Sequence, residues 1–241
     1  MKKYIYCLLL PLVSLLAVSC SDDDDKLPAI KPADRGTVID NEGNTYGWVR
    51  IGDLLWTTSN ANNGPEINEN QYFDRFNWQY IYTDKWGVDE DAVEEYNESY
   101  RPVCGNLMNY QAAVASAPEG WRLPSDEDWQ KLEKALGMSD TGAKGRRGNG
   151  QAFRLQEKES GTELAMIPAG GFIFEPVYGV IRLNLQYQDV YGFYWTSTVD
   201  PSYIDEETAY YRKFLVGNGS IWRECSSTQQ LMSVRWVKDA E

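Results

Sequence analysis

Histidine is absent from the 241 residues of the chain. Its absence removes the commonest general base, the serine and cysteine triads that depend on that base, and the commonest ligand of transition metals. Cysteine is scarce, with four residues, of which Cys7 and Cys20 lie in the N-terminal leader. Cys104 and Cys225 are too few for a cysteine-rich zinc site, and the sequence leaves open whether they form a disulfide. We therefore expect neither a metal site nor a cofactor.

Acidic side chains are the remaining source of catalytic groups, because the chain holds 36 Asp and Glu residues and pairs of carboxylates can hydrolyse glycosides. No acid lies in a sequence context that predicts burial, and the densest group, EGWRLPSDEDW at residues 119–129, begins a helix. Ser125 is a good N-cap, Asp128 completes a capping box, and the other acids of that turn lie where the helix dipole favours negative charge. We expect the two tryptophans of this segment to belong to the core and Arg122 to form an ion pair. The protein is therefore not expected to be an enzyme, with an unrecognised hydrolase as the least favoured alternative.

Two polar turns resemble ligand-binding loops but lack essential residues. DNEGN, residues 40–44, alternates oxygen-bearing side chains like the start of a calcium loop, yet the bidentate glutamate of an EF-hand is missing at the required place. GRRGNG, residues 145–150, lacks the Lys-Ser/Thr ending and the strand–loop–helix setting of a phosphate loop. We interpret the first as a hairpin turn and the second as a basic, flexible surface loop.

The first 19 residues are typical of a secretory signal peptide, with Lys2 and Lys3 before an apolar stretch and small residues before Cys20. The apolar stretch is too short and wrongly flanked for a stable membrane span. LAVSC, which ends at Cys20, resembles a bacterial lipobox, in which the cysteine is lipidated and becomes the first residue of the mature chain. The alternative is an ordinary signal peptide followed by a chance cysteine.

An acidic run, SDDDDK at residues 21–26, follows directly. It resembles the export signal that sends lipoproteins of the Bacteroidota to the outer face of the outer membrane, although it also resembles an engineered protease site. We expect residues 20–35 to be a lipidated, disordered linker and residues 36–241 to be a single domain. Loss of residues 1–19 removes two lysines and no acid, so the net charge falls from −13 to −15. Such an acidic chain repels phosphate backbones, which argues against nucleic acid as a partner. We expect association with the membrane through the lipid anchor.

The domain is expected to be α+β, with a few short helices in its first half and a twisted antiparallel sheet toward its end. A hairpin is predicted at 37–39 and 46–51, and helices at 107–117 and from Ser125 to a glycine stop at Gly137. Further strands are predicted at 165–174, 191–198, 208–217, 219–225 and 231–238. A turn at GNG, 217–219, links two of them.

Several segments together resemble the Fibrobacter succinogenes major paralogous domain: TVIDNEGNTYGWVRIGDLLW, CGNLMNYQAA, APEGWRLPSDEDWQKLE, AMIPAGGF, YGFYWTST and SVRWVKD. GWRLP followed by an acidic helix start is also similar, more weakly, to formylglycine-generating domains, whose redox-active cysteine pair has no match here. Both resemblances imply a C-type-lectin-like fold with long loops and termini close together. The family often has two cysteines where this chain has Ala117 and Trp236, which implies the loss of one disulfide.

Aromatic loops are the best candidates for a binding site, because aromatic rings stack on sugar rings. Tyr80, Tyr82 and Trp86 alternate with polar residues in FNWQYIYTDKW, where Trp78 belongs to the family pattern and is expected to be structural. Weaker candidates are Trp222 and Arg223, after the GNG turn, and Tyr203. The alternative for each ring is burial in the core.

The sequence thus favours a surface-exposed outer-membrane lipoprotein with a non-catalytic, lectin-like domain that binds a glycan or another surface macromolecule. The choice of a glycan rests on the resemblance of fold. The alternative is a structural or adhesive protein–protein interaction module of the cell envelope or fimbriae. A large exposed apolar patch would favour this alternative, whereas an aromatic and polar groove would favour glycan binding.

Overall fold

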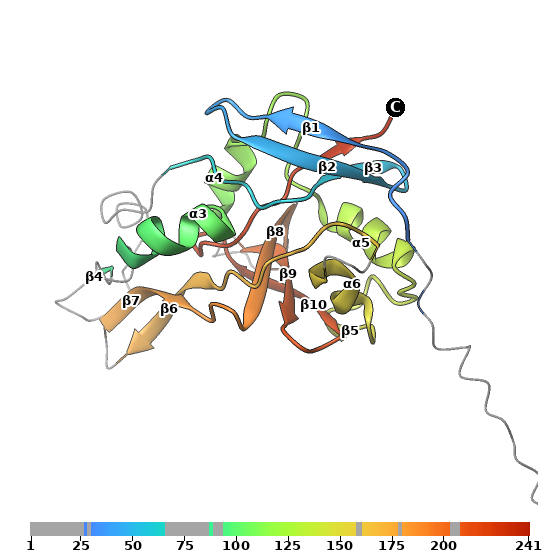
Figure 1. Cartoon of the computed structure of the whole chain (residues 1–241). Coiled ribbons are helices and arrows are strands. Elements are labelled where there is room, and N and C mark those ends of the chain that lie inside the picture. The colour runs from blue at the N-terminus through green and yellow to red at the C-terminus, as the bar shows by residue number, and fades with distance from the viewer. Residues whose placement is uncertain are drawn as a thin grey trace, which may run out of the picture.

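The computed structural model in Figure 1 describes residues 27, 30–65, 87–88, 94–157, 161–177, 180–202 and 208–241. The described strands form three sheets, and short helices lie beside and between them. The α+β class predicted from the sequence is confirmed.

The first sheet contains both ends of the folded chain. Its order is β1 (Arg35–Ile39), β2 (Thr45–Ile51), β3 (Leu54–Thr57) and β11 (Val237–Asp239), with antiparallel neighbours. The carboxylate of Asp40 closes the β1–β2 turn by accepting hydrogen bonds from Glu42, Asn44 and Tyr46. The hairpin interpretation of DNEGN is therefore confirmed, and the first and last described strands lie in one layer (Figure 1).

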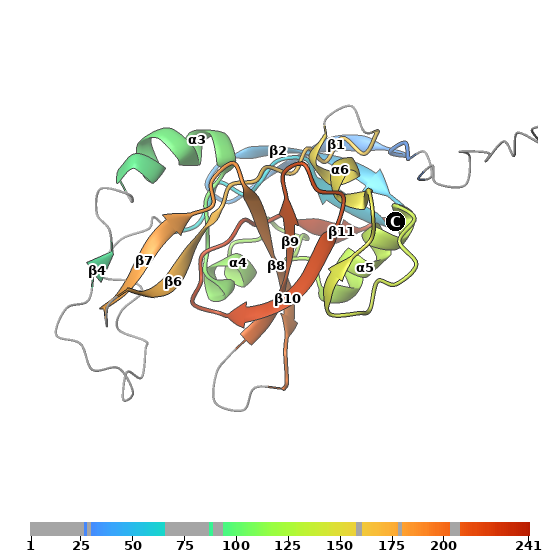
Figure 2. The same cartoon turned by 90° about the horizontal axis from the view of Figure 1, so that it is seen from below.

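The second sheet has the order β5 (Gly145–Arg147), β10 (Ile221–Ser227), β9 (Thr208–Leu215) and β8 (Tyr191–Val199), again with antiparallel neighbours. Figure 2 shows β8, β9 and β10 side by side. The strands predicted at 191–198, 208–217 and 219–225 are confirmed. The turn between the last two lies at Gly217, whose φ of 73° is accessible to glycine at little cost.

The third sheet and the helices complete the fold. The sheet has the order β4 (Gly87–Val88), β7 (Val180–Gln186) and β6 (Gly171–Val177). The helical segments are η1 (Tyr96–Tyr100), α3 (Arg101–Cys104), α4 (Tyr110–Ala115), α5 (Asp126–Ala135) and α6 (Gln151–Gln156). α4 and α5 confirm the helices predicted at 107–117 and after Ser125. Gly137 ends α5 as predicted, because at φ 89° its N–H reaches the carbonyl oxygen of Lys134.

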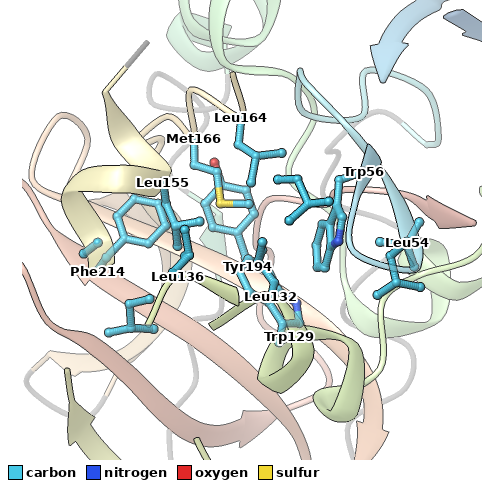
Figure 3. Packing of buried hydrophobic residues seen from close by; sticks show 14 of the residues in the cluster. Leu54, Trp56, Trp129, Leu132, Leu136, Leu155, Leu164, Met166, Tyr194 and Phe214 are labelled. Carbon is cyan, nitrogen blue, oxygen red and sulfur yellow. The ribbon is translucent and has the colours of Figure 1, made fainter. Parts of the chain in front are cut away.

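The largest core cluster lies where the first sheet, α5, α6 and the second sheet meet (Figure 3). The fully buried rings of Trp56 and Trp129 pack edge to face with their centroids 5.1 Å apart, and Tyr194 lies 6.1 Å beyond Trp129. Such ring pairs add about 0.5–1.5 kcal/mol to the free energy gained from burial. Trp129, Leu132 and Leu136 reach this cluster together because residues three and four apart share one face of a helix.

Two smaller clusters of buried side chains complete the core. One contains Phe193, Trp195 and Trp236, with Ala117 and Trp121 partly buried against it. Ala117 and Trp236, the two positions at which the resembled family often has cysteine, thus pack in the same apolar cluster. The other small cluster is formed around Tyr96 and Phe172.

Some predictions of local structure are wrong. Gly145–Arg147, expected in a flexible loop, form β5 because they pair with β10. The strand expected at 165–174 begins only at Gly171. The segment 231–238 is a continuous strand only from Val237, because its earlier residues bridge several partners in turn. α6, in the second half of the chain, was not predicted, and its first turn lacks a side-chain cap.

The part of the chain expected to be a linker already touches the domain at its end. Ile30 packs against the largest cluster, and the carbonyl oxygen of Leu27 accepts a hydrogen bond from Arg154 of α6. Within the described residues, no helix is long and apolar enough to cross a membrane.

Candidate binding site

The segment EGWRLPSDEDW ties the start of α5 to the end of the chain. The Ser125 hydroxyl accepts the backbone N–H of Asp128 at 3.1 Å, and the Asp128 carboxylate accepts that of Ser125 at 2.7 Å. Arg122 forms ion pairs with Asp128 and with Asp239 of β11. Trp129 is buried and Trp121 is partly buried. The predicted capping box, ion pair and core tryptophans are confirmed.

The expectation that no acid is buried is wrong, because Asp126 and Glu133 of α5 lie inside the protein. Arg212 of β9 binds both acids, at 2.7 Å to Asp126 and 2.6 Å to Glu133. Arg147 of β5 also binds Glu133, and Arg223 of β10 also binds Asp126. We call these two acids and three arginines the ion network. The arginines come from distant strands, so the sequence around α5 gave no sign of them.

The ion network fixes the charge state of Asp126. Burial opposes ionisation of this carboxyl, but the hydrogen bonds and positive charges of Arg223 and Arg212 outweigh burial and lower its pKa to about 2. Each oxygen of Asp126 is already hydrogen-bonded to an arginine. Asp126 therefore binds α5 to the second sheet as a carboxylate, and it is not free to transfer a proton.

Cys104 and Cys225 are free thiols, so the structure contains no disulfide between them. The Cys225 thiol donates to the carboxylate of Asp200 at 2.8 Å, and Lys144 donates to the same oxygen at 2.9 Å. Burial and the neighbouring Asp200 raise the pKa of Cys225 to about 11. The thiol therefore stays protonated at neutral pH and is a poor nucleophile. In the part of the chain that the structure describes, no group of three or more Cys, Asp or Glu residues could hold a metal ion.

The face of the second sheet opposite α5 carries a row of aromatic rings and cations. This row, which we call the aromatic face, consists of Tyr187, Tyr191, Lys213, Trp222 and Arg146. The rings of Tyr187 and Tyr191 are 5.4 Å apart. Lys213 Nζ lies 5.8 Å from the Tyr191 ring and 5.6 Å from the Trp222 ring, and Arg146 Cζ lies 5.8 Å from the Trp222 ring. All three cation distances lie within the range of cation–π attraction.

The register of the sheet places three members of this row side by side. Lys213 of β9 lies opposite Trp222 of β10, and Trp222 lies opposite Arg146 of β5. Successive side chains of a strand point to opposite faces. Arg212 and Arg223, the sequence neighbours of Lys213 and Trp222, therefore point toward α5 and join the ion network.

The aromatic face is partly exposed and rests on buried rings. Tyr187 is 43 % exposed, Arg146 is exposed, and Trp222 is half-buried. Beside Lys213 on the same face of the sheet, the buried Tyr211 donates a hydrogen bond of 2.6 Å to Glu224, which also binds Lys213 at 2.9 Å. The hydrogen bonds and ion pair hold the exposed groups in defined positions, as a binding surface requires.

The structure places the binding residues predicted from the sequence in different environments. Trp222 lies in the aromatic face. Arg223 points to the opposite face, where it binds Asp126 and its guanidinium lies 4.1 Å from the Tyr210 ring. The structure therefore does not bring Trp222 and Arg223 together. The remaining residues lie outside the described part of the chain: Tyr80, Tyr82, Trp86, Tyr203 and the lipidation residue Cys20.

Four members of the aromatic face were not predicted from the sequence as binding residues: Tyr187, Tyr191, Lys213 and Arg146. The GNG turn carried part of the signal, because a hairpin centred there sets Lys213 opposite Trp222. Arg146 could not be found in this way, since its strand was interpreted as a loop.

Comparison with known proteins identifies a family. The model of the Fibrobacter succinogenes major domain matches residues 49–238, which is most of the chain. No curated protein and no solved structure matches. The matched residues run from β2 to β11 and include both the ion network and the aromatic face. The chain belongs to the Fibrobacter succinogenes major domain family.

Proposed function

We propose that the protein is an outer-membrane lipoprotein, anchored through Cys20 and exposed on the cell surface, whose domain binds a glycan without catalysing a reaction. The aromatic face is the observation that carries this proposal. The signal peptide, the lipobox-like LAVSC and the acidic run after it support the location. The resemblance to C-type-lectin-like domains supports a recognition role.

The chemistry of the aromatic face suits a sugar. The partly exposed rings of Tyr187, Tyr191 and Trp222 offer flat apolar surfaces for the C–H faces of pyranose rings. Lys213, Glu224 and Arg146 lie beside these rings and supply donors and acceptors for hydroxyl groups. Sites that bind small molecules commonly combine apolar rings with a few fixed polar groups in this way.

The contacts of three acids support a role without catalysis. Asp126 and Glu133 are bound by arginines. Glu224, beside the aromatic face, is bound by Lys213 and Tyr211. An acid and a base that cleave a glycoside need access to the bond, and these three carboxylates are already held by other side chains.

An adhesive role is the second candidate, because exposed apolar side chains lie at the ends of β8 and β9. Val190 and Val216 are 42 % and 48 % exposed, and a backbone hydrogen bond of 3.0 Å joins them beside Tyr191. A protein partner could cover exposed apolar side chains of this kind.

A glycan array tests the proposed function. We expect the full chain, purified in detergent, to bind at least one glycan, and Trp222→Ala to abolish that binding. Phe153→Ala on α6 is the matched control, since it removes an exposed aromatic ring outside the aromatic face. Absence of binding by the unchanged chain, or equal binding by Trp222→Ala, contradicts the proposal.

Treated cell surfaces separate the two candidates. Periodate destroys sugar diols and spares most of the polypeptide, whereas a protease removes surface proteins. Binding that is lost after periodate and survives protease treatment supports the glycan. The opposite pattern, together with loss of binding in a Val190→Ser, Val216→Ser variant, supports the adhesive role.

A further inference from the structure

We infer that the glycan bound by the aromatic face carries an acidic group, and that Arg146 binds this group while Trp222 stacks on the sugar ring beside it. This inference rests on the proposed function and specifies its ligand class. It depends on the position, contacts and charge of Arg146.

Arg146 is an exposed arginine with free bonding capacity. Its Nε donates to the Ser220 hydroxyl at 2.9 Å, which fixes the direction of the guanidinium. Neither Nη atom donates to a described residue, and no carboxylate in the described ranges pairs with it, whereas its sequence neighbour Arg147 is bound to Glu133. The two Nη groups therefore present the planar fork that binds a carboxylate or sulfate through two parallel hydrogen bonds.

The guanidinium lies next to a stacking surface. Its Cζ is 5.8 Å from the half-buried Trp222 ring, and the two residues are directly opposite each other on β5 and β10. A sugar ring stacked on Trp222 would therefore place its ring substituents within reach of Arg146. A uronic acid has its carboxylate on the ring carbon, and a sulfated sugar has its sulfate on a ring hydroxyl, so both place the anion in this region.

The local charge also favours an anion. The aromatic face contains two cations, Arg146 and Lys213, and the single carboxylate of Glu224 contacts only Lys213 among them. The whole chain, by contrast, has a net charge of −13. This charge repels a densely charged polymer over about 10 Å at 0.1 M salt, and contact with Arg146 acts at shorter range. The fit is therefore best for a glycan with widely spaced acidic groups.

Pairs of glycans that differ only in charge test the inference. Alginate, pectin, hyaluronan and chondroitin, each beside its carboxyl-reduced form, are presented to the full chain in detergent. Chondroitin sulfate and its desulfated form separate sulfate from carboxylate. We expect at least one acidic member to bind about tenfold or more tightly than its neutral partner, which is the effect of a charge-assisted hydrogen-bond pair.

Two variants separate the role of the charge from that of the ring. Arg146→Gln should remove the preference for the acidic member and leave its affinity close to that of the neutral one, while Arg146→Lys should retain part of the preference. Trp222→Ala should weaken both members of the pair. Thermal unfolding of each variant shows that the fold is kept.

The outcomes distinguish this inference from the proposed function. If acidic and neutral members bind equally and Trp222→Ala loses that binding, the inference of an acidic ligand is wrong and the proposed glycan-binding function stands. An acidic preference that survives Arg146→Gln also overturns the inference. No binding to any member overturns the inference, whereas the glycan site stands or falls with the glycan array. Preference for the sulfated member alone supports it, with sulfate as the bound group.

Discussion

Replacement of one buried carboxylate, Asp126→Asn, tests whether the ion network stabilises the fold. The asparagine keeps the shape of the side chain but removes the charge that Arg212 and Arg223 share. The drop in the pKa of Asp126 from 3.8 to about 2 corresponds to roughly 2 kcal/mol of stabilisation at 1.36 kcal/mol per pH unit. Removal of one partner of a buried ion pair costs about 3–5 kcal/mol. We therefore expect a loss of about 2–5 kcal/mol.

Urea denaturation at pH 7 measures this loss. The midpoint should fall while the dependence of the unfolding free energy on urea concentration stays the same, since the surface exposed on unfolding does not change. Glu127→Gln is the matched control on the next residue, because Glu127 is 79 % exposed and its contact with Lys131 is 3.6 Å long. Exposed pairs of this kind contribute less than about 0.5 kcal/mol.

The pH dependence provides a second measurement on the same variant. Because the pKa of Asp126 is lower in the folded protein than in the unfolded chain, its ionisation stabilises the fold above about pH 4. That contribution is lost as the pH falls from 3.8 through about 2, and Asp126→Asn should lack this part of the acid sensitivity. A loss below 1 kcal/mol at pH 7, or an unchanged acid titration, would refute the stabilising role of the network.

Three further predictions address other parts of the chain. Gly170→Ala should destabilise the protein by about 1–3 kcal/mol in urea denaturation, since the φ of Gly170 is 67° and a Cβ there would meet the backbone of β7. Gly43→Ala is the control and should cost less, because the space around Gly43 is open. Cys225 should react slowly with iodoacetamide at pH 8, because its pKa is about 11, and Asp200→Asn should speed the reaction; fast alkylation of the unchanged chain contradicts this. Cys20→Ala should abolish incorporation of labelled fatty acid, and continued labelling would refute the lipobox interpretation.

Local signals in the sequence predicted the elements that depend on neighbouring residues. Ser125, Asp128 and Gly137 predicted both ends of α5, because caps act within a few residues of the chain. The turn at Gly217 predicted the β9–β10 hairpin for the same reason. These features require no knowledge of the tertiary structure.

Features that depend on distant partners could not be predicted. The burial of Glu133 depends on Arg147 and Arg212, which are 14 and 79 residues away. The same long-range pairing makes a strand out of Gly145–Arg147, although the glycines around it favour a loop. Of the candidate site, the sequence predicted only Trp222. Arg146 and Lys213 meet it through the register of three strands, and Tyr187 and Tyr191 reach the site through tertiary contacts.

The ion network and the aromatic face are two sides of the same strands, which leads to a last prediction. Asp126 binds Arg212 of β9 and Arg223 of β10, so one carboxylate links the two strands from beneath. Lys213 is the neighbour of Arg212 on β9, Trp222 is the neighbour of Arg223 on β10, and both point to the aromatic face. The link through Asp126 therefore helps to fix the spacing between Lys213 and Trp222. Loss of the carboxylate should therefore loosen β9 and β10 more than the rest of the fold.

Amide hydrogen exchange detects such local loosening without a ligand. We expect Asp126→Asn to accelerate exchange in β9 and β10 beyond its effect on the first sheet. Gly170→Ala is the control, because it destabilises the protein through the backbone of Gln186–Gln188 and leaves the Asp126 carboxylate in place, so it should not favour β9 and β10. If both variants accelerate exchange in the same pattern, Asp126 contributes only to global stability, and the spacing of Lys213 and Trp222 is set by the sheet alone.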